Sequence, residues 1–131
     1  MIYFKEFSKA AIQDIRKTTH YLKDTLKNRT AAERLITSAE AKVNELIIFP
    51  CQHPIVSDPL LALYKIRYAQ IKNYLMFYTV NEDTKTVYIV RFLYSRSDWQ
   101  GILKKSIHYD KYLSDETSGY VHEKQEEFNR K

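Results

Sequence analysis

The sequence predicts a single α+β domain: an N-terminal strand, a two-helix hairpin packed on a twisted antiparallel sheet of about four strands, and a short C-terminal helix. The 131 residues are enough for one ordinary domain and too few for two of typical size. Apolar residues recur every three or four positions as far as Pro50, which is typical of helices. Beyond residue 62 they alternate, which is typical of strands.

The first half of the chain is expected to hold one strand and the hairpin. Residues 2–7 are apolar and aromatic enough for an opening strand, and Ser8 is a good N-cap for the first helix. An apolar stripe from Ile12 to Leu26 predicts a helix of about 18 residues. After a break at 28–29, Thr30 and Glu33 have capping-box spacing, so a second helix should run to Pro50.

The second half is expected to form a meander. All three prolines lie in residues 49–59, and because proline lacks a backbone donor this segment is predicted as a loop. Residues 63–68, 74–80 and 86–94 are predicted strands, and their connectors are short enough to make them antiparallel. Ser97 and Gln100 predict a short helix that ends the domain 1–105. The polar residues 106–131 are expected to be a C-terminal extension, and the sequence pattern leaves its structure undetermined.

Composition narrows the function classes. With 2 Gly in the chain a glycine-rich phosphate loop has no place, and Cys51 has no partner for an internal disulfide. No leader or long apolar run is present, so we expect a cytoplasmic protein without a membrane association. Cys51 and the scattered His lack the spacing of zinc sites, and no hydrolase motif occurs, so we expect no metal and no cofactor.

The charge distribution favours a polyanionic partner. The net charge is +5, and residues 1–105 carry 17 basic and 10 acidic side chains, whereas residues 106–131 carry 4 and 6. Within the strand predicted at 63–68, Lys65 and Arg67 should point from one face about 6.6 Å apart. They are either a phosphate-binding pair or two ordinary solvent-facing residues opposite a buried face.

A second group of candidates lies where the last strand meets the last helix. Arg96 is expected at this corner, where a guanidinium can fork onto a phosphate, or else form a salt bridge to Asp98 or Glu82. Tyr94 and Trp99 flank Arg96, and a base could stack on either ring. We therefore predict Lys65, Arg67 and Arg96 as catalytic residues, and Arg91, Tyr94 and Trp99 as RNA contacts.

This order of elements, together with several short motifs, resembles the RelE/ParE family of bacterial type II toxins. The motifs that carry the resemblance are Tyr3-Phe4, Asp14-Ile15, Phe49-Pro50, Tyr64-Lys65-Ile66-Arg67, Asn73-Tyr74 with Tyr78, and residues 90–99. The resemblance implies a toxin neutralised by a co-encoded antitoxin. It further implies a ribosome-dependent mRNA endoribonuclease that needs no metal, in which Lys65, Arg67 and Arg96 bind the phosphate and assist attack by the RNA 2′-hydroxyl.

The resemblance also leaves a second activity open, the inhibition of DNA gyrase seen in ParE-like members, or a catalytically inactive binding module. Leu75 stands where the nuclease pattern has a further arginine. Near the position of the catalytic tyrosine in the final helix of that pattern, this chain has Ile102. For the nuclease, Lys65 is the first candidate for a general base, since cationic neighbours and desolvation would lower its pKa.

Overall fold

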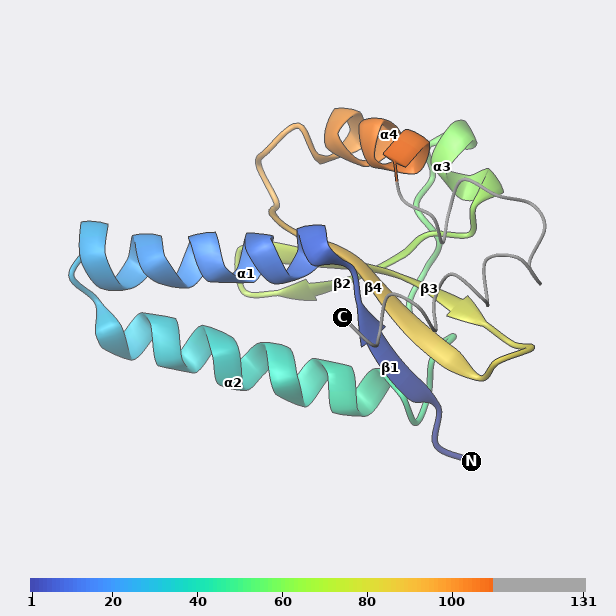
Figure 1. The fold of residues 1–131 in the computed structure, drawn as a ribbon, viewed down its shortest axis with the longest axis horizontal. Coiled ribbons are helices and arrows are strands. Elements are labelled where there is room, and N and C mark those ends of the chain that lie inside the picture. Colours follow the sequence, from blue (N-terminus) through green and yellow to red (C-terminus); the bar gives the residue numbers. More distant parts are fainter. Residues whose placement is uncertain (110–131) are drawn as a thin grey trace. The chain divides into compact units, whose positions relative to one another are not determined.

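The computed structural model describes residues 1–109, in two compact units, Met1–Ser97 and Asp98–Lys131 (Figure 1). The first unit contains β1 (Phe4–Phe7), α1 (Lys9–His20), the π-helical turn η1 (Tyr21–Thr25), α2 (Arg29–Leu46), α3 (Pro59–Leu63), β2 (Arg67–Ile71), β3 (Tyr74–Asn81) and β4 (Thr86–Tyr94). The described part of the second unit is α4 (Trp99–Tyr109). The two units divide between Ser97 and Asp98, and most of the expected extension lies outside the described residues.

The first unit is built on a four-stranded sheet with the order β1-β4-β3-β2. β2, β3 and β4 are antiparallel neighbours and form the predicted meander. β1 instead pairs with β4 in parallel, so the expectation of a purely antiparallel sheet is wrong at this edge. The reason is topological: the long connection from β1 through the helix hairpin can return the chain to a parallel neighbour. The α+β class itself is confirmed.

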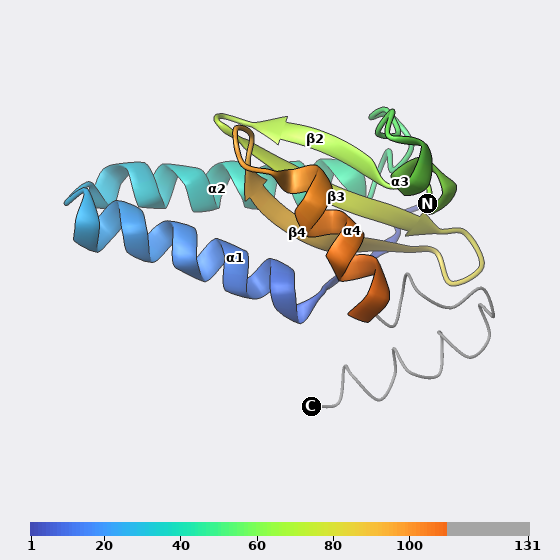
Figure 2. The same ribbon diagram turned by 90° about the horizontal axis from the view of Figure 1, so that it is seen from above.

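The helix hairpin forms as predicted, with a different cap on its second helix. Ser8 caps α1, because its Oγ accepts a hydrogen bond from the Ala11 amide. α2 is capped by Asn28, whose Oδ1 accepts from the Ala31 amide, so the predicted capping box at Thr30 is wrong. Asn28 satisfies a free amide at the helix start two residues earlier. Figures 1 and 2 show α1 and α2 running antiparallel beside the sheet.

The core lies between the hairpin and one face of the sheet. Its buried members come from α1, α2 and the three meander strands: Ala11, Leu35, Ala39, Val43, Leu46, Ile71, Met76, Tyr78, Val87, Ile89 and Phe92. A β-bulge opposite Phe77 places Ile89 and Phe92, three residues apart, in the same core. The apolar stripe predicted from Ile12 to Leu26 is only partly covered, since Ile12 is 38% and Leu26 is 52% exposed.

The segment after the prolines contains a helix that the sequence analysis did not predict. The Asp58 carboxylate accepts from the Leu60 and Leu61 amides, and Pro59 occupies the first turn, where its missing donor costs nothing. α3 ends at Leu63, and Lys65 follows it in the left-handed region with φ 55°. The predicted strand 63–68 is thus wrong over its first four residues, and the strand begins at Arg67.

The N-cap of α4 lies one residue later than predicted, at Asp98 and not at Ser97. The Asp98 carboxylate accepts a hydrogen bond from the Gly101 amide at 3.2 Å. Ser97 instead donates its hydroxyl proton to the Tyr94 carbonyl at 2.6 Å. Asp98, not Ser97, therefore caps α4, and its negative charge also suits a helix N-terminus.

Candidate functional site

Lys65 and Arg67 do not share a strand face. Lys65 is exposed in the turn after α3, outside any strand, whereas Arg67 is the first residue of β2. Arg67 pairs with Tyr78 across the β2–β3 ladder, and cross-strand partners point to the same side of a sheet. Tyr78 is part of the core, so Arg67 lies on the side of the sheet that the hairpin covers.

Arg67 is held by the proline loop. Its guanidinium donates to the His53 carbonyl at 2.6 Å and to the Cys51 carbonyl at 3.3 Å. The Tyr78 hydroxyl donates to the Pro50 carbonyl at 2.8 Å, and burial raises the pKa of Tyr78 to about 12 although the Arg67 charge opposes this. Arg67 and Tyr78 together satisfy carbonyls of a loop whose prolines have no backbone N–H to donate.

Arg91 connects the sheet to the first helix. Its guanidinium grips Asp14 with two bonds, Nε to Oδ2 at 2.7 Å and Nη2 to Oδ1 at 2.8 Å. The Phe92 amide also donates to Asp14, and the two side chains are 20% and 9% exposed. This bidentate geometry gives Arg91 a structural task and does not support the predicted RNA contact.

Arg96 lies at the predicted corner and is open to solvent. The Ser95 amide donates to the Asn73 carbonyl at 2.8 Å, which fixes the end of β4 beside the β2–β3 turn. Arg96 makes no hydrogen bond or ion pair to a described residue, so the alternative of a salt bridge to Asp98 or Glu82 does not occur within residues 1–109. Its guanidinium keeps its donors available for an anion.

A tyrosine cluster stands beside Arg96. Tyr94 is 44% exposed, and its ring meets the edge of Tyr74 at 5.8 Å between centroids. Tyr74 in turn stacks on buried Phe92 at 5.3 Å, and burial, with Tyr94 and Tyr21 nearby, raises the pKa of Tyr74. Tyr94 is therefore a ring with a fixed orientation and an open surface.

The predicted cations do not meet in one hollow. Arg67 is level with Tyr78 and the end of β4 is level with Tyr74, so Arg67 and the Arg96 corner are separated by four residues of β3, about 13 Å along the strand. Lys65 lies beyond the Arg67 end, since it precedes β2. The predicted concave basic face lined by all three is therefore wrong. Trp99 begins α4 and belongs to the second unit.

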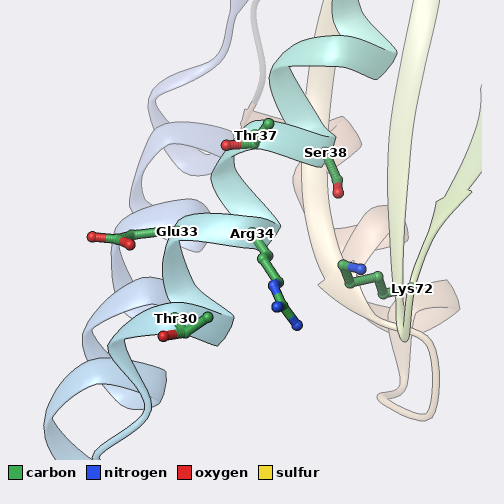
Figure 3. A pocket seen from close by; sticks show the side chains of 6 residues that line it. All are labelled: Thr30, Glu33, Arg34, Thr37, Ser38 and Lys72. Carbon is green, nitrogen blue, oxygen red and sulfur yellow. The ribbon is translucent and has the colours of Figure 1, made fainter.

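A different pair of cations faces a shallow hollow of about 410 Å³ between α2 and the β2–β3 turn. Figure 3 shows Arg34 and Ser38 on α2 pointing toward Lys72, while the Glu33 carboxylate points away from them. Thr30 and Thr37 complete the lining. The sequence analysis missed this group because Arg34 and Lys72 are 38 positions apart, although the helical spacing of Arg34 and Ser38 placed them on one face.

The described part of the chain has neither a metal-binding cluster nor a membrane-spanning helix. Residues 1–109 hold no group of three or more His, Cys, Asp or Glu side chains that could bind a metal ion. None of the helices among them is long and apolar enough to cross a membrane.

The chain is similar to known toxins in sequence and in fold. The family model of the ParE toxin of the type II toxin–antitoxin system parDE matches residues 6–99. The RelBE2 toxin–antitoxin complex from Mycobacterium tuberculosis has a chain that is 17% identical with a TM-score of 0.51, covering 72% of this chain and 99% of that one.

An arginine-to-alanine double mutant of the E. coli toxin RelE in the free state is also 17% identical, with a TM-score of 0.53 and coverage of 80% of this chain and 98% of that one. No curated protein sequence matches the chain. The family match spans most of the chain and the structural matches share its fold, so the protein belongs to the ParE toxin family and is a RelE/ParE toxin of a type II toxin–antitoxin system.

Proposed function

We propose that this toxin cleaves mRNA on the ribosome without a metal ion and that a co-encoded antitoxin neutralises it. The observation that carries the proposal is the Arg96 corner, where an exposed arginine without an ion pair to residues 1–109 follows the open ring of Tyr94 by two positions. A guanidinium offers paired donors that match phosphate oxygens and keeps its charge at any physiological pH. An aromatic ring offers a stacking surface for any base.

The proposed mechanism places one nucleotide across this corner. The base stacks on Tyr94, and Arg96 binds the adjacent scissile phosphate. When the 2′-hydroxyl loses its proton to water and attacks phosphorus, the bond to the 5′-oxygen breaks and this oxygen takes a proton from water. The products are a 2′,3′-cyclic phosphate and a 5′-hydroxyl, and the negative charge of the phosphorane is stabilised by Arg96. The ribosome and the mRNA supply most of the positioning, which is where a large part of the rate enhancement originates.

Lys65 and Arg67 take a different place in this proposal. Arg67 already donates to two loop carbonyls, so its task is to hold the proline loop and, through its remaining donors, to add positive charge. Lys65 is exposed just before β2, at the end of that strand away from Arg96. It is proposed to contact a phosphate further along the RNA. The proposal therefore assigns charge stabilisation to Arg96 alone.

The antitoxin partner is supported by a structural neighbour and by charge. That neighbour was solved as a toxin–antitoxin complex. The surplus of basic residues in this chain favours an acidic partner segment, whose binding should weaken as salt screens the charges.

The test is cleavage of ribosome-bound mRNA in a translation reaction with the purified full chain. Arg96→Ala should lower the cleavage rate by about 100-fold or more, because a preorganised donor to a developing charge is lost. Arg16→Ala removes the same charge from an exposed position of α1 and should leave the rate within about twofold. Equal cleavage by Arg96→Ala and the unaltered toxin would overturn the proposed role.

Inhibition of DNA gyrase is a second candidate that a specific observation favours. Leu75, in the position where the nuclease pattern has an arginine, is a buried apolar residue of β3. With Arg67 also engaged by the loop, two of the expected cations are missing from any RNA site at the Arg96 corner. DNA breakage that depends on gyrase, with mRNA left intact, would select this candidate.

A further inference from the structure

The hollow between α2 and the β2–β3 turn brings two unneutralised cations together. Arg34 and Ser38 are one helical turn apart on α2, and both point toward Lys72 (Figure 3). Neither Arg34 nor Lys72 makes an ion pair with a residue of the described part of the chain. Two like charges facing one space repel unless an anion lies between them.

The backbone at Lys72 allows its charge to be removed by a substitution that suits the fold. Lys72 has φ 54°, a left-handed conformation that costs a residue with a Cβ roughly 1 kcal/mol or more and that glycine adopts freely. Lys27, Lys65 and Lys85 share this conformation, so the backbone by itself indicates no ligand. What distinguishes Lys72 is that it faces Arg34 and Ser38 across the hollow (Figure 3).

The chemistry of the lining selects a phosphate. The Arg34 guanidinium, the Lys72 ammonium and the Ser38 hydroxyl together offer more donors than a single carboxylate can accept, whereas a phosphodiester presents several oxygens in different directions. Glu33 also borders the hollow, but its carboxylate is turned away from both cations.

The turn that borders the hollow is hydrogen-bonded to the corner proposed to bind RNA. The β2–β3 turn that carries Lys72 accepts the Ser95 amide through the Asn73 carbonyl, one residue before Arg96. We propose that Arg34, Lys72 and Ser38 bind one backbone phosphate of a single-stranded RNA, next to the nucleotide held at Arg96. This inference rests on the proposed function for the identity of its ligand.

The test is the binding of a fluorescently labelled single-stranded RNA oligonucleotide to the purified full chain, followed by anisotropy over a range of salt concentrations. The variant Arg34→Gln/Lys72→Gly removes both charges. It also places glycine at position 72, where the left-handed φ favours it. It should bind RNA about tenfold more weakly at low salt, and the slope of log K against log salt should fall by about 0.7, the value for one lost phosphate contact on a single strand.

The matched control is Lys27→Gly/Arg29→Gln. Lys27 is also left-handed, with φ 54°, and Arg29 is also an exposed arginine of α2, so the control loses the same charges from the hairpin turn. We expect its affinity within about twofold of the unaltered chain. An equal loss in the control would mean that overall charge, not the hollow, binds RNA, and would overturn the inference.

The remaining outcomes separate this inference from the proposed function. An unaltered chain that binds RNA through the hollow but leaves mRNA intact refutes the nuclease and supports the subsite. A chain that cleaves mRNA while Arg34→Gln/Lys72→Gly binds RNA normally supports the nuclease and overturns the subsite. Failure of the unaltered chain to bind RNA overturns the inference as well. A loss of antitoxin binding alone would overturn it by assigning the hollow to a protein partner.

Discussion

Four lysines occupy the left-handed region of the backbone, at φ between 52° and 55°: Lys27, Lys65, Lys72 and Lys85. Each sits where a helix or strand ends, a position at which glycine or asparagine is common. The chain contains 2 glycines, so its turns are built with a residue that pays for the conformation. Each of these turns therefore carries a lysine charge. Replacing that lysine with glycine removes the charge and also relieves the strain of the left-handed backbone.

This reasoning predicts opposite results for one substitution at two exposed lysines. Lys27→Gly should leave the free energy of unfolding unchanged or raise it by up to about 1 kcal/mol, because relief of the left-handed strain offsets the entropy of glycine. Lys17→Gly, inside α1, should lower it by about 1 kcal/mol. Urea unfolding of both variants checks this, and an equal loss in both would show that Lys27 is not strained.

The Asp14–Arg91 pair predicts a second result at this scale. Asp14→Ala should cost about 3 kcal/mol, because it leaves a poorly exposed guanidinium and the Phe92 amide without their acceptor. Asp14→Asn should cost less, since an amide oxygen can still accept from Phe92.

The control for this pair is Asp24→Ala. Asp24 is bonded to His20 at 2.7 Å, but both side chains are more than half exposed, so we expect a change within about 0.5 kcal/mol. Thermal or urea unfolding measures all three variants. Equal stability of Asp14→Ala and Asp24→Ala would contradict the structural role of the buried pair.

At the scale of elements, the proline loop contains His53, a histidine whose pKa is lowered in the folded chain. Burial, with the Lys42 charge nearby, lowers the pKa of His53, although Glu45 acts in the opposite direction. His53 Nε2 is 3.7 Å from Glu45 Oε1, too far for a hydrogen bond, and it has no other partner in the described part of the chain. The fold therefore favours the neutral imidazole.

The sign of the resulting pH dependence follows from proton linkage. Between the folded pKa and the ordinary value of 6.5 the unfolded chain binds more protons, so stability is fully present above about pH 6.5 and falls as the pH drops through this window. Unfolding by urea at pH 7.5 and 5.5 should show lower stability at 5.5, and His53→Gln should reduce the difference. The same difference in both proteins would exclude His53 as its source.

The elements that the sequence predicted best are those with long, regular patterns. Residues 74–80 and 86–94 predicted β3 and β4 because both are long runs rich in aromatic and β-branched residues, which are typical of strands buried on both faces. α3 was missed although Asp58 and Pro59 form a helix-start signal, because the alternation from Leu63 to Tyr68 suggested a strand. That error placed Lys65 on a strand face and created the false pair with Arg67.

The rest of the site depends on geometry that local patterns do not encode. The bulge opposite Phe77 breaks the alternation of β4, and Arg91 reaches Asp14 on a helix 77 residues away. The meeting of Arg34 with Lys72 arises from how α2 crosses the end of β2, which composition and spacing leave undetermined. Arg96 and Tyr94 were placed correctly because a strand-to-helix corner is a local feature.

For the whole molecule, the basic surplus divides into two kinds of charge. Lys42, Lys85 and Arg91 pair with carboxylates inside the fold. Arg34, Lys72 and Arg96 make no ion pair within residues 1–109, and all three belong to the end of the sheet where β4 meets the β2–β3 turn. These three cations lie where RNA is proposed to bind, whereas Arg16, Lys27 and Arg29 carry charge on the hairpin that is also unpaired among the described residues, and they serve as controls.

The most direct measurement adds one preparation of the full chain to two reactions in parallel, a translation mixture with a defined mRNA and a gyrase reaction with supercoiled DNA. We expect mRNA fragments with cyclic 2′,3′-phosphate ends that appear only with ribosomes, and DNA without gyrase-linked breaks. Intact mRNA together with gyrase-dependent breakage would contradict the proposed nuclease.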